Sequence, residues 1–312
     1  MSNTFKKILQ FKICEKEINY TKLNPKNWRR PPFKKIIRGL AFLIIFLGAL
    51  IIVKDEYEYQ FGDYSYYSDN EISENSEDEY DCNVLGIEIH GDVVTYITPY
   101  SKDENGNNIF DETASEEVIY LINQADKDSD IKAIILEIDS FGGSAVAAEE
   151  ISEAIKRANK PIIAFIRTAG VSAAYWAASG ADTIFASALS DVGGIGITMS
   201  YLDKTKKNEK EGLTYNSLST GKFKDYGDPN KPMTTEERNL IMRDLEIVHN
   251  LFIKAVSENR NLSIDKVRAL ADGSSMPGEM ALENGLIDKI GDFYDVEDYL
   301  KEKLGEKIEV CW

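Results

Sequence analysis

The sequence is poor in the residues that build metal centres and disulfide frameworks. Its 312 residues include three cysteines and two histidines. It contains no Cys-x-x-Cys pair and no Cys/His cluster, and two histidines cannot form a histidine-rich metal site. Cys82 and Cys311 alone do not make a disulfide framework. We therefore expect no metal and no cofactor.

The sequence also lacks the basic excess that nucleic-acid-binding proteins carry. Its formal net charge is −17, whereas a phosphate backbone is bound by a basic face. The charge is unevenly distributed along the chain. Residues 1–38 hold eleven Lys or Arg and two acids, while residues 54–81 hold eleven Asp or Glu and one Lys. We expect no nucleic-acid partner.

A long uncharged run lies between these two charged blocks. Residues 39–53 carry no charge, and the apolar stretch 36–53, with Arg38 at its edge, forms about 27 Å of helix at ~1.5 Å per residue. A buried core helix is the alternative; a cleaved signal peptide is disfavoured because KDEYEY follows the run. We predict a transmembrane anchor at 36–53, a basic cytoplasmic tail at 1–35 and an acidic flexible linker at 54–81. The remainder is then extracytoplasmic, in a single-pass cell-membrane protein.

After residue 82, short apolar runs alternate with amphipathic segments. Strands are expected at 84–93, 133–139 and 161–167, further short strands within 183–197, and helices at 116–127, 145–160, 234–260, 263–273 and 278–288. The long helix has a capping box at its start, from Thr234 or Thr235 with Glu237 or Arg238. Successive strand–turn–helix units predict an α/β domain with a largely parallel sheet. We place it at 82–305, followed by a C-terminal tail at 306–312.

Two loops at the ends of predicted strands contain candidate functional residues. Gly142 and Gly143 let the backbone approach a ligand, so their amides could form an oxyanion hole, although an ordinary tight turn has the same composition. Ser172 falls at the first turn of the next helix and is either a helix cap or a nucleophile. The amide of Ala173 could join the oxyanion site.

A nucleophilic serine needs a base, and the sequence offers few. His90 lies in a strand-end turn and His249 lies within the long helix, so neither obviously faces Ser172. Lys222 or Lys224, in the stretch STGKFKD, could form a Ser–Lys dyad. Such a lysine must lower its pKa from ~10.4 to ~7–8, which costs roughly 4 kcal/mol and requires burial.

Five motifs, taken in order, resemble the signal peptide peptidase A group of peptidase family S49. They are DSFGGSAVAAEEISEAI, GVSAAYWAASGADTIFAS, GGIGI, STGKFKD and ENGLIDKIGD, within about Val84 to Gly291. The resemblance implies a ClpP/crotonase-like fold of repeated ββα units. It implies Ser172 as nucleophile rather than Ser179, and Lys224, third after Gly221, as the base rather than Lys222. The chain departs from the family pattern at Phe141, which replaces a proline, and in DGSSMPG, residues 272–278.

The same resemblance implies an activity and an assembly. It points to a membrane-anchored serine endopeptidase that degrades hydrophobic peptides such as remnant signal peptides. Family members of this length form homo-oligomeric rings in which serine and lysine come from neighbouring subunits. The departures at Phe141 and residues 272–278 motivate an alternative, a catalytically inactive membrane scaffold or regulator. A crotonase-like acyl-CoA enzyme is a third hypothesis, for which Lys224 would be unnecessary.

Overall fold

The computed structural model describes residues 82–98 and 110–312. The predicted tail, the anchor at 36–53 and the linker lie outside the described residues. Within those two ranges, the structure contains no helix that combines the length and the apolar character needed to span a bilayer. The strands are β1 (Val84–Val94), β2 (Glu112–Ala114), β3 (Ala133–Gly143), β4 (Ile162–Val171), β5 (Thr183–Ala186), β6 (Asp191–Gly193), β7 (Ser275–Pro277), β8 (Lys289–Ile290) and β9 (Val310–Cys311). The helices are α2 (Ser115–Lys127), α3 (Ala145–Arg157), α4 (Ala173–Ser179), α5 (Thr205–Lys210), α6 (Thr235–Asn259), α7 (Ile264–Leu270), α8 (Gly278–Asn284) and α9 (Phe293–Leu304).

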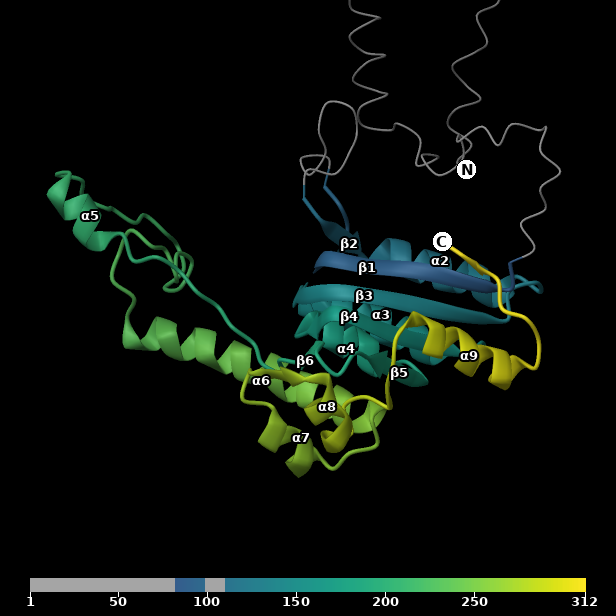
Figure 1. Cartoon of the computed structure of the whole chain (residues 1–312). Helices are drawn as coiled ribbons and strands as arrows, with labels where there is room; N and C mark the ends of the chain where they lie inside the picture. The colour runs from purple at the N-terminus through teal and green to yellow at the C-terminus, as the bar shows by residue number, and fades with distance from the viewer. Residues whose placement is uncertain (1–81, 99–109) are drawn as a thin grey trace, which may run out of the picture. The chain divides into compact units, whose positions relative to one another are not determined.

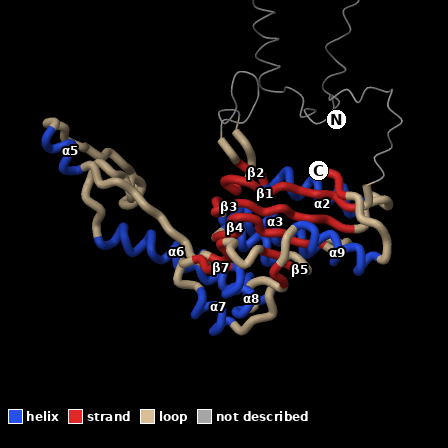
Figure 2. The backbone as a smooth tube through the Cα atoms, in the orientation of Figure 1, coloured by secondary structure: helices blue, strands red, loops and turns tan. Residues whose placement is uncertain are grey.

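The strands form one mostly parallel sheet with the order β2-β1-β3-β4-β5-β8 (Figure 2). β6 pairs with the end of β4, β9 pairs with the start of β1, and β7 pairs antiparallel to β6. The central strands are apolar runs because helices cover both of their faces, as parallel sheets require. The prediction of an α/β domain with a largely parallel sheet is therefore confirmed.

The two faces of the sheet are covered differently (Figure 1). Helices α2, α3 and α4 pack with the larger apolar cluster, while α9 covers the smaller one. In the smaller cluster, Val296 and Leu300 of α9 pack on residues of four strands, which are Val84, Ala133, Ile135, Ile163, Phe165 and Phe185. Neither layer of helices covers the carboxyl ends of β3 and β4, where the candidate site lies.

Helix α4 explains why residues 167–180 are so rich in alanine and serine. All seven of its residues are buried between α3 and the strands β3 and β4. Small side chains allow this close approach, and the two aromatic residues fill the remaining space. Tyr175 is fully buried and donates its hydroxyl to Leu286 O at 2.8 Å, while Trp176 stacks on Phe252 with 4.8 Å between ring centroids.

The ends of the described domain are joined to each other. Cys82 and Cys311 form a disulfide across 229 residues of sequence, and β9 pairs with β1 beside it. The Trp312 ring lies over Gly86, where a Cβ atom would come within 2.3 Å of it. From the sequence we expected no disulfide framework, and this single crosslink was not predicted. The residues predicted as a C-terminal tail, 306–312, thus contribute a strand and a crosslink.

Candidate active site

Ser172 lies in the sharp turn between β4 and α4. Its φ of 55° and ψ of −122° belong to a region that non-glycine residues rarely adopt. The backbone holds this conformation, because Ser172 N–H donates to Gly193 O at 2.7 Å and Ser172 O accepts from Trp176 N at 2.9 Å. The Ser172 side chain makes no capping hydrogen bond to the helix. The sequence left Ser172 as either a helix cap or a nucleophile. The structure therefore disfavours the helix cap.

The end of β3 packs directly against this serine. Gly142 has a φ of 117°, and a Cβ atom there would lie 2.9 Å from Ser172 Cβ and 3.0 Å from Ala173 N. Gly143 has a φ of 152°, and its Cβ would lie 2.2 Å from Val93 O. Neither position can hold another residue without a shift of the backbone. The structure thus brings Gly142, Ser172 and Ala173 together.

The amides of these residues differ in availability. Ala173 starts α4, and the first helical hydrogen bond comes from Trp176, so the Ala173 N–H has no partner within its own helix. The Gly142 N–H instead donates to Ser140 Oγ at 3.0 Å, and that hydroxyl donates to Gly91 O at 2.6 Å. Ser140 is buried, and sequence reasoning gave it no role. It fixes the glycine loop to the end of β1.

The candidate lysine lies in another part of the domain. Lys224 is in the loop before α6, and its side chain is exposed. Figure 1 shows α5 and the first half of α6 extending away from the sheet that carries Ser172. The single chain therefore does not bring Ser172 and Lys224 together.

The loop lysines differ in their ion pairs. Lys222 Nζ lies 2.7 Å from a carboxylate oxygen of Glu236. Lys231 pairs with Glu237 and lies 3.4 Å from Asp225. The hydrogen bond to Glu237 raises the pKa of Lys231 above its usual value. Across residues 82–98 and 110–312, Lys224 Nζ has no hydrogen bond or ion pair.

The segment that carries these lysines has almost no buried interior. In residues 198–251, which we call the arm, Glu237 is the one buried residue. Large apolar side chains of the arm are exposed instead, and they are Met199, Tyr201, Leu202, Leu213, Tyr215, Leu218, Tyr226, Met242, Ile247 and Leu251. α6 begins with the predicted capping box, formed by Thr234 and Glu237. It joins the core near its end, where Phe252, Ile253 and Val256 are buried.

The histidines do not provide a base in the described chain. His90 Nε2 lies 3.3 Å from Glu137 Oε1, which also accepts a hydrogen bond from Arg167 at 2.9 Å. His249 lies on α6, and its Nε2 is buried without a hydrogen-bond partner among the described residues. Neither histidine hydrogen-bonds to Ser172.

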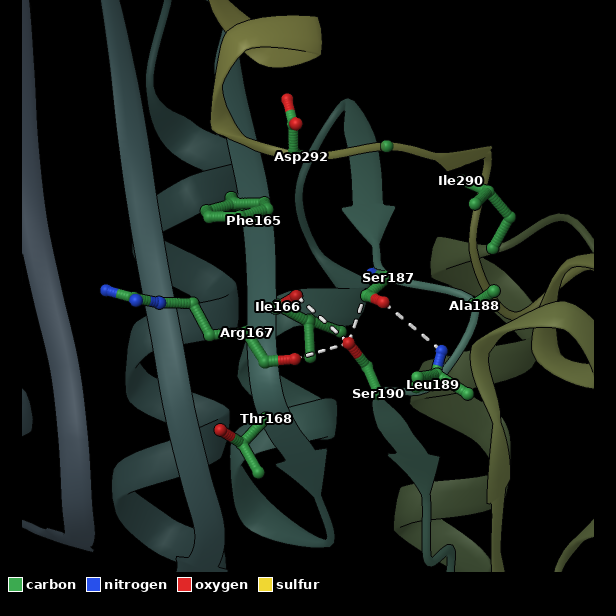
Figure 3. Close-up of a pocket in the computed structure, with 11 residues that line it drawn as sticks. Phe165, Ile166, Arg167, Thr168, Ser187, Ala188, Leu189, Ser190, Ile290 and Asp292 are labelled. Carbon is green, nitrogen blue, oxygen red and sulfur yellow. Dashed lines mark hydrogen bonds between the residues drawn. The ribbon is translucent and has the colours of Figure 1, made fainter.

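A cavity of about 550 Å³ lies beside β4, but Ser172 does not line it (Figure 3). Its walls include Phe165, Arg167, Leu189 and Asp292, and Ser190 Oγ closes one side by hydrogen-bonding to main-chain carbonyls of β4. The surface around Ser172 is formed by loops of β3, β4 and β6 instead.

Comparisons with known proteins show which family the chain is similar to. The model for peptidase family S49 matches residues 154–307, which include Ser172 and Lys224. A "putative protease" of Methanocaldococcus jannaschii is 31% identical over 207 residues, covering 65% of this chain and 66% of that protein. A "putative signal peptide peptidase SppA" of Enterococcus faecium is 29% identical over 245 residues, covering 76% and 69%. The chain thus spans about two thirds of the length of these relatives.

Among solved structures, a ClpP1 mutant from Listeria monocytogenes aligns with a TM-score of 0.43 and 13% identity, covering 69% of this chain and 95% of that one. The ClpP/crotonase topology of repeated ββα units stays a prediction. The family resemblance drawn from the five motifs is confirmed by the family model and the relatives. The chain is an SppA-like member of peptidase family S49.

Proposed function

We propose that the chain is a membrane-anchored serine endopeptidase with a Ser172–Lys224 dyad. One observation carries the proposal. Ser172 is held at a positive φ, its hydroxyl caps no helix, and the Gly142 backbone packs against it. A strained strand-to-helix turn that exposes a serine hydroxyl is a known way to present a nucleophile. The family match across both dyad residues supports the assignment.

The reaction follows from these positions. Neutral Lys224 takes the proton from Ser172 Oγ as the oxygen attacks the peptide carbonyl carbon. The amides of Ala173 and Gly143 donate to the resulting oxyanion, since the Gly142 amide already bonds to Ser140. Lys224 then gives its proton to the leaving amine. Water, deprotonated by Lys224, hydrolyses the acyl-enzyme, and Ser172 recovers its proton.

The ion pairs of the loop support Lys224 over Lys222. A carboxylate beside a lysine stabilises the charged form and raises its pKa, which opposes action as a base. Lys222 has such a partner in Glu236, whereas Lys224 has none in the described chain. Burial of Lys224 against another subunit would lower its pKa, as the mechanism requires.

The arm supports the proposal that the dyad is shared between subunits of a homo-oligomer. It exposes ten large apolar side chains, and Leu218 is 99% exposed. So many exposed apolar side chains on a segment with almost no buried interior favour an interface, and a second copy would cover them. The neighbour's serine would then meet this chain's Lys224.

The anchor at 36–53 remains part of the proposal, with the catalytic domain outside the cytoplasm. We propose hydrophobic peptides such as remnant signal peptides as substrates. The name of the Enterococcus relative and the predicted membrane attachment support this substrate class.

The proposal predicts that purified protein hydrolyses a hydrophobic peptide reporter. Ser172→Ala and Lys224→Ala should each lower the rate at least about 10³-fold, because nucleophile and base act as a unit. Lys222→Ala is the matched control and should stay near wild-type activity. Full activity in either dyad variant would overturn the assignment.

Coexpression of the two inactive variants tests whether the site is shared. If serine and lysine come from different subunits, about a quarter of the sites in a random mixed oligomer are intact. If both come from one chain, no site is intact. Recovery of about a quarter of the activity is therefore expected, and none would contradict the shared dyad.

The inactive scaffold is kept as a second candidate because Phe141 and residues 272–278 depart from the family pattern. Phe141 is 69% exposed, and Ser274 O accepts a hydrogen bond from Gly194 N at 3.1 Å behind the serine. A fluorophosphonate probe separates the two, because it labels Ser172 only when the hydroxyl is activated.

A further inference from the structure

Lys231 is half-buried and pairs with Glu237, the one buried residue of the arm. Its ammonium pairs with Glu237, whose side chain is 4% exposed, and lies 3.4 Å from Asp225 Oδ1. Glu237 also accepts the Thr234 N–H at 2.8 Å in the capping box. Lys231 thus bridges the first turn of α6 to the loop that carries Lys224.

The other carboxylates around the loop that carries Lys224 also have ion-pair or hydrogen-bond partners. Glu236 pairs with Lys222, and Asp228 accepts hydrogen bonds from Asn230 and Tyr215. Asp225, the residue that follows Lys224, accepts from Tyr215 and faces Lys231. Of the lysines in this loop, Lys224 is the one that forms no ion pair with a carboxylate of the described chain.

We propose that Lys231 is a positioning residue for the reaction, because it pairs with Asp225, the residue that follows Lys224, and so keeps this carboxylate from pairing with Lys224. This inference rests on the proposed function. A protonated Lys224 held by Asp225 could neither lose its proton to become a base nor leave the loop to reach a neighbouring serine. Lys231 removes that competitor without touching the substrate.

The expected effect of its loss has a definite sign. Without the Lys231 charge, the carboxylate of Asp225 is free to attract the ammonium of Lys224. An opposite charge within ~4–6 Å favours the charged form and shifts a pKa by about 1–3 units. The acidic limb of the pH profile of kcat/KM should therefore move to higher pH.

The test compares pH–rate profiles of the assembled protein on the hydrophobic reporter. Lys231→Gln keeps hydrogen-bond donors for Glu237 and removes the charge. We expect the acidic limb of its kcat/KM profile to shift to higher pH by about one unit. At pH values below the limb, kcat/KM should be roughly tenfold lower than in the wild type, and above the limb it should be close to the wild-type value. Lys231→Arg should restore the wild-type limb. Lys207→Met, which removes an exposed lysine of α5 that pairs with Glu211, should leave the limb unchanged.

The double variant Asp225→Asn/Lys231→Gln decides the cause. Removing the competing carboxylate should return the limb to its wild-type position. A uniform loss at every pH in Lys231→Gln, an unshifted limb, or a shift that Asp225→Asn does not reverse would each overturn the inference. Activity that survives Lys224→Ala would instead overturn the proposed function, so the two failures are distinguishable.

Discussion

At the scale of single residues, the candidate site depends on atoms that fit only in one arrangement. Gly142 lies against Ser172 and Ala173 with no space for a side chain. Its amide is fixed by Ser140, which in turn is fixed to Gly91. The glycine loop and the serine turn are therefore one rigid unit, and a change in either displaces the other.

Gly142→Ala should separate catalysis from folding. The added methyl would lie 2.9 Å from Ser172 Cβ, so the serine or the loop must shift, and misplacement of about 1 Å costs on the order of 10²-fold in rate. Hydrolysis of the reporter measures this. Gly305→Ala is the matched control, because it has a positive φ of 75° with nothing within 4 Å. Similar losses in both variants would contradict a specific role for Gly142.

The sequence predicted where these residues lie but not how they are held. Loops were predicted after strands that end at residues 139 and 167. The structure continues these strands to Gly143 and Val171, so the candidate segments lie at the strand ends themselves. The positive φ of Ser172 and the Ser140 hydrogen bonds depend on strands that are distant in sequence. No local pattern contains that information.

At the scale of elements, α6 combines two environments in one helix. Its last part is buried in the core, while its first part lies in the arm, where an ion pair and a capping box take the place of apolar packing. The sequence predicted the helix and its capping box. The sequence could not predict that the first half of α6 lies away from the core. The apolar residues of that half have the same spacing as those of a helix whose apolar face is packed.

The start of α6 should be sensitive to acid. The hydrogen bond from Lys231 lowers the pKa of the Glu237 carboxyl below its usual 4.5. A lowered folded-state pKa gives stability that is present above the unfolded value and is lost as pH falls through the folded one. Hydrogen exchange of the arm amides, corrected for intrinsic rate, should therefore speed up as the pH falls below 4.5.

Glu237→Gln should remove the acid step that comes from the capping box, since the carboxyl at this position is gone. Ser263→Ala is a useful comparison, because it removes the cap of α7, whose acceptor is a hydroxyl, and should weaken that helix equally at each pH. An acid step that persists in Glu237→Gln would assign the effect to other carboxyls.

At the scale of the whole described domain, the two ends are held together by β9 and the Cys82–Cys311 disulfide. The crosslink closes a loop of 229 residues, which in the chain-entropy model stabilises the fold by up to about 5 kcal/mol. The sequence alone could not show that Cys82 and Cys311 pair, because their proximity depends on how the sheet places β9 beside β1.

Cys82→Ser/Cys311→Ser should lower Tm by several degrees and leave kcat of the oligomer nearly unchanged. The crosslink lies at the start of β1, whereas Ser172 follows the carboxyl end of β4 and the arm extends away from the sheet. Calorimetry of oxidised protein, reduced protein and the double variant measures this. Equal Tm values for oxidised and reduced protein would contradict a stabilising crosslink.

The joined ends also affect how the polypeptide could be re-engineered. Asn83 N–H donates to Glu309 O at 3.0 Å, so the point of entry into the sheet and the carboxyl end are neighbours. A short linker could therefore join the two ends of the described domain. Circular permutation that links residue 312 to residue 82 and opens the chain near Gly212, where an added Cβ atom would meet nothing within 4 Å, would keep every strand of the sheet in order.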